Sequence, residues 1–376
     1  MALSDVAKTA SSYKQPSVAV LGSHSALDIS SGARAFGLRS IVVCQKGREK
    51  TYEKYYTKRQ TPLGQTGCID EIMLLDKFID IADKKSVDAL VKKQALFVPH
   101  RSFSVYVGYD AIENKFNVPI FGNRYLLKAE ERNTPKNQHW LLEKAKVRIP
   151  MTFDSPEKID RLVIVKASEA KRKYERAFFI VHSYHEYERK SKEMLARGLI
   201  TKEGLETALI EEFVLGAQFN FNFFASPLTG QLELMGTDFR RQTNLDGLLR
   251  LTAPEQTEIL KLARMKNIEV GHVACTIRES LLERVFEMGE KFAETCRREY
   301  KPGLIGPFAL QGAIIPTENG EEPVIFDVSF RVPGSPGVRY TPYGDYLWGR
   351  SMSVGERIAL EVKSAAKENR LGEIVT

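Results

Sequence analysis

The first residues that could do chemistry lie in the loop Gly22-Ser23-His24, directly after the short apolar run at 17–21. Apolar residues recur at mixed helical spacing after this loop, so the pattern predicts a strand that hands over to a helix. The N-terminus of a helix presents unpaired N–H groups and the positive end of its dipole, which favour an anion and most often a phosphate. A Ser23 that only caps the helix, with His24 as an ordinary loop histidine, explains the same residues equally well.

Ser102 is a second candidate, because it follows another apolar run, at 95–99, and the loop residues His100 and Arg101. In an open sheet of parallel strands, the carboxyl ends of the strands converge on one crevice. If both apolar runs form such strands, Ser102 could face the same ligand as His24.

The second half of the chain carries a different set of polar residues within or beside apolar runs. These residues are Lys166, the segment Glu211-Glu212-Phe213-Val214, and Gln311 and Asp327 on two runs separated by a turn. A lysine inside an apolar strand has to reach solvent or an anion, because burying an unpaired ammonium is costly. Carboxylate and amide oxygens on adjacent strands suit Mg²⁺, which is commonly completed by nucleotide phosphates. Each residue alone is more often structural, so their order along the chain is the informative feature.

These candidates need elements that bring them together, and the N-terminal third supplies a first set. Apolar runs separated by helix-like stretches occur at 17–21, 39–44, 95–99 and 118–122. Strands that alternate with helices are typical of a doubly wound parallel sheet. We therefore expect an α/β fold with a parallel sheet over residues 1 to about 125.

From about residue 140 the pattern changes to strands joined by short loops. The runs at 219–225 and 231–240 alternate with period two, which is typical of antiparallel strands with one buried face. Further strands are predicted at 162–167, 178–183 and 208–216, and a hairpin is predicted around 318–322. Helices are predicted at 187–197, 279–300 and 354–368. This half of the chain is of the α+β class.

The amino-acid composition limits the classes of protein to which this chain could belong. The chain has 376 residues, of which 43% are hydrophobic and 27% charged, so we expect a folded protein of two or three domains. The net charge is +7, but the basic residues are scattered among acids, which favours phosphorylated small molecules over nucleic acid as partners. The four cysteines lie too far apart to indicate a zinc site or a disulfide framework. No apolar run is long enough to cross a membrane, so we expect a soluble, cytoplasmic protein.

Several longer segments, taken in order, resemble one known family. They include VAVLGSHSALDISSGARAFG near the N-terminus, FVPHRSF (97–103), IEEFVLG (210–216), TNLDGLLRL (243–251), IRESLL (277–282), GPFALQ (306–311) and the C-terminal SMSVGERIALEVK. On these segments the chain resembles the archaeal ATP-grasp ligases that formylate aminoimidazole carboxamide ribonucleotide (AICAR) with free formate. These are the formate-dependent FAICAR synthetases of purine biosynthesis. The matching segments span most of the chain.

The resemblance implies a pre-ATP-grasp α/β domain with a parallel sheet at 1–125, which binds the ribonucleotide, and an α+β ATP-grasp fold at 126–376. The two lobes of the ATP-grasp fold would comprise about 140–215 and 216–376. The implied activity is that of an ATP-dependent carbon–nitrogen ligase, which makes FAICAR from AICAR through formyl phosphate in IMP biosynthesis. ATP, Mg²⁺, AICAR and formate would be its ligands. The chain would form a homo-oligomer, without nucleic-acid or membrane partners.

The same resemblance assigns substrate-binding residues. His24 and Ser102 would contact the ribonucleotide, and Arg240 and Asn244 would lie against it from the ATP-grasp side. His24 would also be catalytic, by orienting the amine of the substrate or accepting its proton. A histidine suits that role because its ordinary pKa lies near the working pH.

For the nucleotide, the resemblance implies that Lys166 meets the phosphates of ATP. The segment Glu211, Glu212, Phe213 and Val214 would form the hinge that reads adenine and holds ribose. Gln311 and Asp327 would be the Mg²⁺ ligands.

The sequence departs from the family pattern at three places. The loop at 166–179 lacks the glycines with which the family closes over ATP phosphates, and its residues 171–173 carry positive charge instead. Asp327 stands where the family has a glutamate, and Arg101 stands where a glycine is usual. These differences keep two alternatives open. One is an ATP-grasp carboxylate–amine ligase on another phosphorylated substrate, and the other is a non-catalytic paralogue that binds AICAR or ATP.

Overall fold

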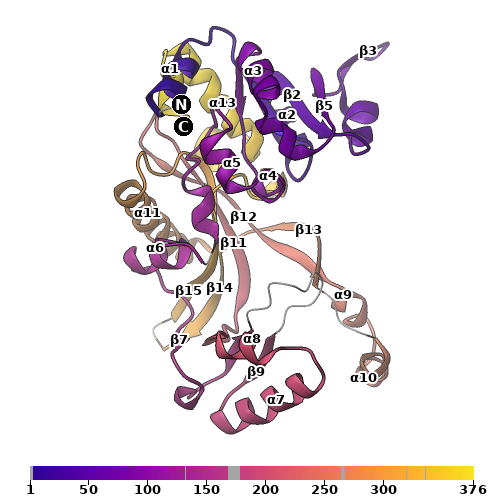
Figure 1. Cartoon of the computed structure of the whole chain (residues 1–376), viewed down its shortest axis with the longest axis vertical. Helices are drawn as coiled ribbons and strands as arrows, with labels where there is room; N and C mark the ends of the chain where they lie inside the picture. The colour runs from indigo at the N-terminus through magenta and orange to yellow at the C-terminus, as the bar shows by residue number, and fades with distance from the viewer. Residues whose placement is uncertain (1–2, 132, 168–177, 264–266, 319, 335) are drawn as a thin grey trace.

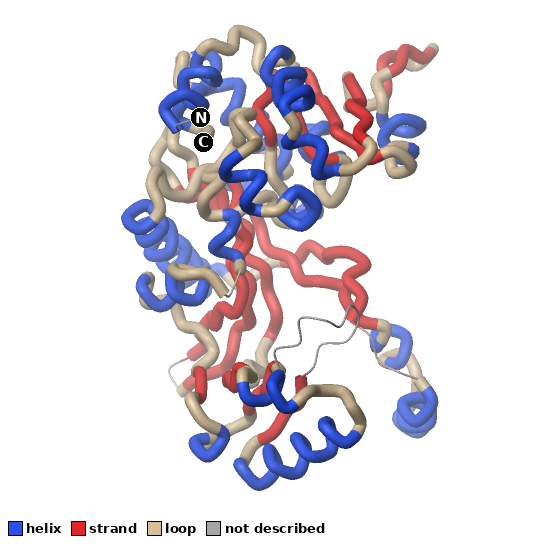
Figure 2. Tube along the Cα trace, in the orientation of Figure 1, coloured by secondary structure: helices blue, strands red, loops and turns tan. Residues whose placement is uncertain are grey.

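The computed structural model describes residues 3–131, 133–167, 178–263, 267–318, 320–334 and 336–376. Figure 1 shows the N-terminal part of the chain above a long antiparallel sheet, with a small sheet and its helices at the opposite end. In Figure 2 the strands of the long sheet run between these two ends. The long sheet therefore connects the parts of the chain that carry the candidate residues.

A four-stranded parallel sheet with the order β5-β2-β1-β6 forms the N-terminal part. Its strand β1 (Ser17–Leu21) is buried throughout, as expected for a parallel strand with both faces covered. The helix α2 (Ala26–Ala35) follows the loop after β1, and the other strands are β2 (Arg39–Gln45), β5 (Glu71–Leu75) and β6 (Ala95–Phe97). The predicted parallel sheet is confirmed.

Two details of that prediction are wrong. The run at 118–122 is not a strand, because it makes only isolated bridges, a parallel one between Ile120 and Phe97 and an antiparallel one between Phe121 and Val375. Pro119 has no N–H to donate, and its carbonyl oxygen accepts from the Phe97 N–H at 2.8 Å. The fourth strand is β5, whose five residues are too few to give a periodic signal in the sequence.

The long sheet is antiparallel and has the order β13-β12-β11-β14-β15. Its strands are β11 (Ala217–Ala225), β12 (Leu232–Thr243), β13 (Asn267–Cys275), β14 (Gly306–Thr317) and β15 (Gly320–Ser329). One face carries Phe221, Phe223 and Phe308, which share a core with Phe292 of α11 (Leu282–Glu299). Successive side chains of a strand alternate between the two faces of a sheet. The polar residues between these phenylalanines therefore point to the opposite face.

The three predicted helices are present with shifted ends. The helix predicted at 279–300 begins as a 3-10 turn at Glu279–Leu281 and continues as α11. The helix predicted at 187–197 is α7 (Tyr184–Ala196), which starts earlier because Ser183 caps it by accepting from the Glu186 N–H. The helix predicted at 354–368 is α13 (Val354–Lys367).

The small sheet has the order β7-β10-β8-β9 and shares a core with α7. Its strands are β7 (Thr152–Phe153), β8 (Val163–Lys166), β9 (Phe178–Val181) and β10 (Leu209–Glu212). Residues 168–177 lie outside the described residues, and they include most of the loop at 166–179 and its basic residues 171–173.

The C-terminal helix α13 returns to the N-terminal part and packs against α2. Gly32 of α2 and Gly355 of α13 allow the two backbones to approach closely, since a Cβ at position 32 would lie 2.1 Å from the Gly355 carbonyl carbon. Ile358 and Val362 of α13 belong to the same core as Val18 of β1. A boundary at residue 125 therefore separates the sheets but not the cores, and the domain division stays a prediction.

The remaining elements surround these sheets. The helices are α1 (Leu3–Ser11), α3 (Lys84–Lys92), α4 (Arg101–Val107), α5 (Tyr109–Asn114), α6 (Gln138–Lys144), α8 (Lys202–Glu206), α9 (Leu245–Leu248), α10 (Ala253–Leu262) and α12 (Tyr343–Trp348), and a hairpin pairs β3 (Arg59–Thr61) with β4 (Gly64–Thr66). Short 3-10 or π segments lie at Thr51–Tyr56, Phe78–Ala82, Leu127–Glu130, Pro156–Lys158, Pro336–Tyr340 and Leu371–Glu373. Within the described ranges, every helix is too short or too polar to cross a bilayer.

Candidate active site

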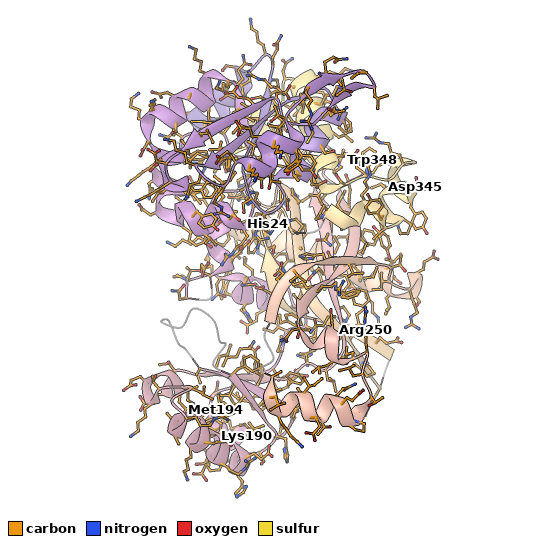
Figure 3. All side chains as sticks on the ribbon, turned by 90° about the vertical axis from the view of Figure 1, so that its right-hand side faces the viewer. His24, Lys190, Met194, Arg250, Asp345 and Trp348 are labelled. Atoms are coloured by element: carbon orange, nitrogen blue, oxygen red, sulfur yellow. The ribbon has the colours of Figure 1, made fainter. Side chains whose placement is uncertain are left out.

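A cavity of about 680 Å³ lies between the N-terminal part and the long sheet. His24 lines it from the N-terminal part, and Figure 3 shows this residue at the end of that part nearest the long sheet. The side chains that line it from the long sheet are mostly polar, namely Asn220, Asn222, Asp238, Arg240, Glu269, His272, Gln311, Asp327 and Ser329. Residues that are far apart in the sequence thus share one polar cavity.

Part of this wall is a row of residues that runs across the long sheet. Asp327 is paired with Gln311, Gln311 with Asn220, and Asn220 with Asp238 in the registers of neighbouring strands. Directly paired residues of antiparallel strands bring their Cβ atoms to within about 5 Å of one another. The row therefore presents two carboxyl groups and two amides to the cavity, side by side.

His24 has an unusual backbone conformation, with a φ of +48° in the left-handed region. Its ring stacks on that of His100 with 5.4 Å between the ring centroids. Its Nδ1 atom lies 2.8 Å from Ser25 Oγ, which donates its proton to the Pro333 carbonyl oxygen at 3.1 Å. Ser25 must then accept from the His24 Nδ1–H, which leaves the Nε2 lone pair as a proton acceptor.

The pKa of His24 differs from the expected value near the working pH. Burial by the surrounding protein is the largest cause, and the neighbouring His100 and Arg331 add to it, so that the pKa is lowered to about 3. His24 is therefore neutral at physiological pH. A neutral imidazole can accept a hydrogen bond or a proton, but it does not provide a fixed positive charge.

The structure brings the first two candidate loops together but places Arg101, and not Ser102, on the cavity wall. Ser102 Oγ donates to Ser23 Oγ at 3.0 Å, so it lies beside the loop that carries His24. The Arg101 guanidinium lies 3.2 Å from the Glu130 carboxylate and 3.3 Å from the Glu131 carboxylate. The loops converge as expected for strands that end at the same edge of a sheet.

Arg240 and Gln311 contact each other directly in the cavity, where the guanidinium donates to Gln311 Oε1. Gln311 also donates through Nε2 to Ser329 Oγ at 3.0 Å. The Nε atom of Arg240 is buried and has no hydrogen-bond partner within the described residues. A buried N–H without an acceptor costs free energy, so an anionic ligand would be stabilised at this point.

Gln311 and Asp327 fit a magnesium ion that takes most of its ligands from elsewhere. The two residues are directly paired between β14 and β15, and both line the cavity. Mg²⁺ is commonly bound through one or two carboxylates together with substrate phosphates and water. Among the residues that the structure describes, no group of three or more His, Cys, Asp or Glu side chains forms a ready-made metal cage. On metal binding, Arg240 would have to release the Gln311 oxygen.

Lys166 and Glu211, both predicted to lie at the nucleotide, are on the small sheet and do not line this cavity. The Lys166 ammonium pairs with the Glu211 carboxylate, which is 4% exposed. The lysine thus finds the anion that its place in an apolar strand requires. A nucleotide phosphate would have to compete with this carboxylate.

The rest of the predicted adenine hinge follows at the end of β10. Glu212 accepts from the Arg148 guanidinium at 2.7 Å and from the Met151 N–H at 3.0 Å. Phe213 and Val214 are partly buried. Arg148 is a residue that the sequence analysis missed, because its partner is distant along the chain.

Asn244 is also away from the cavity wall. It lies in the turn between β12 and α9, where it is exposed. Figure 1 shows β12 and β13 projecting sideways as an arm that carries α9 and α10. The structure therefore brings together His24, Arg240, Gln311 and Asp327, with Ser102 close by, but not Asn244.

Sequence reasoning missed much of the cavity wall, including Asp238, Glu269 and His272. Asp238 is fully buried and accepts from Asn220 Nδ2 at 2.6 Å and from Asn222 Nδ2 at 2.8 Å. His272 Nδ1 lies 2.7 Å from Asp238 Oδ1, and His272 Nε2 lies 3.2 Å from Glu269 Oε1. The alternation in β11 places both asparagines on one face and is a usable signal, whereas the register that sets Asp238 against them is not visible in the sequence.

His24 and His272 differ in charge at neutral pH. Burial alone would lower the pKa of His272, but its hydrogen bonds and charge interactions with Asp238 and Glu269 outweigh burial and raise the pKa to about 9. The hydrogen bond from His272 is the largest cause that lowers the pKa of Glu269 to about 2. The cavity thus holds one neutral and one positively charged imidazole, an arrangement suited to separate roles as base and as cation.

Comparison with known sequences covers nearly the whole chain. Residues 186–376 match a family model described as a domain of unknown function (DUF1297), and residues 18–153 match one described as a protein of unknown function (DUF1246). The chain is 40% identical over 362 residues to the 5-formaminoimidazole-4-carboxamide-1-(beta)-D-ribofuranosyl 5'-monophosphate synthetase of Methanopyrus kandleri, covering 96% of this chain and 95% of the relative. It is 38% identical over 361 residues to the protein of the same name from Methanothermobacter thermautotrophicus, covering 96% and 94%.

Solved structures agree with these relatives. The chain is similar to the IMP biosynthesis protein PurP from Thermococcus kodakaraensis, with a TM-score of 0.66 and 27% identity over 96% of this chain and 100% of that one. It is also similar to N5-carboxyaminoimidazole ribonucleotide synthetase from Thermotoga maritima, with a TM-score of 0.54 and 15% identity over 93% and 76% of the two chains. At that lower identity the likeness concerns the fold alone.

Proposed function

The chain belongs to the family of 5-formaminoimidazole-4-carboxamide ribonucleotide synthetases and has the predicted ATP-grasp fold, and from this premise we propose that it formylates AICAR with ATP and free formate in IMP biosynthesis. One structural observation at the site supports this proposal most strongly. His24 of the N-terminal part lines the same cavity as Gln311 and Asp327 of the long sheet. A ribonucleotide held at His24 and a nucleotide held at Asp327 would meet there, with a one-carbon acid between them.

Formate needs activation, because its oxygen is a poor leaving group and the amine of AICAR, conjugated with a carboxamide, is a weak nucleophile. A formate oxygen attacks the γ-phosphorus of ATP, and the new P–O bond forms as the bond to ADP breaks. The amine nitrogen then attacks the carbon of formyl phosphate, so that a C–N bond forms, the C–O bond to phosphate breaks and phosphate leaves. The amine proton passes to a base, and in this proposal the neutral Nε2 of His24, whose Nδ1 is occupied by Ser25, accepts it.

In this proposal His24 and Ser102 bind the ribonucleotide from the N-terminal part, and Arg240 and Asn244 bind it from the ATP-grasp side. The buried Nε of Arg240, which lacks an acceptor in the described part of the chain, supports an anion at that position. Ser102 would contribute through the loop of Ser23, to which it is hydrogen-bonded. Asn244 has the weakest support of the four, because it does not line the cavity.

For the nucleotide, we propose that Lys166 meets the phosphates and that the segment Glu211, Glu212, Phe213 and Val214 reads adenine and ribose. Gln311 and Asp327 would hold Mg²⁺. The metal supplies positive charge that neutralises the phosphate oxygens during transfer. Asp327 keeps the carboxyl group of the family's glutamate on a shorter side chain, and its direct pairing with Gln311 supports the shared role.

Formate itself contributes little binding energy. It has three heavy atoms, so even at a ceiling of about 1.5 kcal/mol per atom its binding could reach only ~4.5 kcal/mol, which corresponds to roughly millimolar affinity. The protein therefore has to recognise mainly ATP and the ribonucleotide. Water has to be excluded as well, since formyl phosphate would hydrolyse in an open site.

We further propose that the chain divides near residue 125 and that it assembles into a homo-oligomer. The arm formed by β12, β13, α9 and α10 supports assembly. Leu249, Leu260 and Leu262 on this arm are 71%, 50% and 90% exposed, and α10 has no buried residue. Exposed leucines on a projecting arm favour coverage by another protein surface.

Incubation with ATP, Mg²⁺, formate and AICAR tests the proposed function. We expect ADP and formylated product in equal amounts, and neither without formate. ADP formation that requires a different phosphorylated amine would favour the carboxylate–amine ligase, for which Arg101 on the cavity wall could select the substrate. Binding of ATP without turnover would favour the non-catalytic paralogue.

A further inference from the structure

A carboxylate already lies between two cationic side chains of the cavity. Glu269 Oε1 is 3.2 Å from His272 Nε2, and Glu269 Oε2 is 3.8 Å from a terminal nitrogen of Arg240. His272 and Arg240 are directly paired on β13 and β12, so their side chains share one face of the long sheet. The Glu269 side chain is 48% exposed, whereas that of His272 is only 12% exposed. His272 and Arg240 thus form a preformed binding site for a carboxylate. The Glu269 side chain, which occupies this site here, has room to rotate out into solvent.

We propose that His272 is a second catalytic histidine, which together with Arg240 binds the small carboxylate substrate in the place that the Glu269 carboxylate takes here. The inference rests on the proposed function, for which this carboxylate is formate. The His272 Nε2–H donates to a formate oxygen, and then to an oxygen of formyl phosphate while the amine attacks from the side of His24. The bonds made and broken are those of the proposed reaction, and His272 keeps its proton throughout.

Asp238 makes His272 a rigid donor. The His272 Nδ1–H is held at 2.7 Å by a carboxylate that is itself buried and fixed by Asn220 and Asn222. With Nδ1 bound in this way, Nε2 is the nitrogen that can reach a ligand. The raised pKa of His272 keeps the ring charged at neutral pH, and a charge-assisted hydrogen bond is roughly twice as strong as a neutral one.

The position of His272 suits the group that passes between the two substrates. A Cβ built at Gly334 would lie 3.1 Å from Nε2 of both His24 and His272, so the two rings flank this glycine. On the other side, Arg240 contacts Gln311, a proposed Mg²⁺ ligand. The charged or titratable groups around His272 and its neighbour His24 are Asp238, Glu269, Arg240, Arg331 and His100. A carboxylate at His272 would therefore lie between the ribonucleotide and the phosphates.

Steady-state kinetics of two variants separates this role from a structural one. His272→Ala should raise the KM for formate about 10- to 100-fold through loss of a charged hydrogen bond, with little change in the KM for ATP or AICAR. Glu269→Ala removes the competing carboxylate and should lower the KM for formate, or leave it unchanged, at about pH 6, below the ordinary pKa of a histidine, because Asp238 still holds the His272 Nδ1–H. His182→Ala is the matched control, because its side chain is 65% exposed and lies outside the cavity. An equal rise of all three KM values in His272→Ala, or a higher formate KM in Glu269→Ala, would overturn the proposal.

The pH dependence of kcat/KM for formate gives a second readout in the same variants. It should fall in the wild type as pH rises through about 9, because His272 then loses its charge. Removing the negative charge of Glu269 destabilises the imidazolium, so the fall should move to lower pH in Glu269→Ala. A purely structural His272 would leave the position of this limb unchanged.

NMR of the histidine rings keeps this inference separate from the proposed function. The chain has six histidines, so the His272 signal can be assigned by its loss in His272→Ala. We expect this signal to shift when formate is added at about millimolar concentration in the presence of Mg²⁺ and a non-hydrolysable ATP analogue. A shift in a protein that does not formylate AICAR would support the carboxylate site and contradict the proposed function. Formylation with an unmoved His272 signal would overturn the site and leave the function intact.

Discussion

Asparagine in place of Asp327 should slow the formylation of AICAR about 100- to 1,000-fold at saturating substrates, without unfolding the protein. The substitution keeps the size of the side chain but removes the carboxylate that we propose holds Mg²⁺ beside Gln311. The metal neutralises charge that moves during phosphoryl transfer, so its loss weakens the transition state more than the ground state. The measurement is kcat from the release of ADP, with binding of AICAR measured separately and expected to be retained.

Glu321→Gln is the matched control for this prediction. It makes the same change from acid to amide on the same strand, but Glu321 pairs with Arg278 and does not line the cavity. Because such a solvent-exposed ion pair contributes at most about 1 kcal/mol, we expect near wild-type activity. An Asp327→Asn protein that works as well as the control at limiting Mg²⁺ would contradict the proposed metal site.

Alanine in place of Arg357 should lower the free energy of unfolding by about 3–5 kcal/mol. The guanidinium donates to the Glu233 carboxylate at 2.7 and 2.8 Å and to the Glu361 carboxylate at 2.8 Å. Arg357 is 1% exposed and both carboxylates are 3% exposed, so water cannot replace the lost positive charge. Urea denaturation of the wild type and the variant measures the difference.

The free energy of unfolding depends strongly on Arg357 because its helix, α13, joins the two main parts of the molecule. The helix packs on α2 at one side, and its Arg357 lies 4.1 Å from the ring centroid of Phe224 in the long sheet at the other. The control is Lys363→Ala, on the exposed side of the same helix, which should change the free energy of unfolding by no more than about 0.5 kcal/mol. If Arg357→Ala costs less than about 1 kcal/mol, the buried ion network does not hold α13 in place.

The cavity face of the long sheet could be predicted from the sequence, but the pairing across it could not. Phenylalanines that alternate with Asn220 and Asn222 need the core, so the asparagines must face the other way. The register depends on a bulge next to Asn222, and a shift of one residue would turn Asp238 to the opposite face. Asp238 and His272 were missed for this reason, whereas Gln311 and Asp327 could be named from their oxygen side chains on two neighbouring runs and from the family resemblance.

The docking of α13 shows a second limit of sequence reasoning. The helix itself is evident, with Ser353 and Glu356 forming a capping box at its start. Its partner is not evident, because Gly32 and Gly355 look like ordinary helix glycines until the two helices are placed together. Contacts between residues so far apart in the chain depend on the whole fold.

The central claim is that a phosphoryl group passes from ATP to formate in this cavity, and the fate of the formate oxygens tests it most directly. The protein is incubated with formate labelled with ¹⁸O at both oxygens, together with ATP, Mg²⁺ and AICAR, and the phosphate released is analysed by mass spectrometry. The account predicts one ¹⁸O atom in each phosphate, because the oxygen that attacked the γ-phosphorus leaves with it when the amine displaces phosphate. Formylated product accompanied by phosphate without ¹⁸O would contradict it.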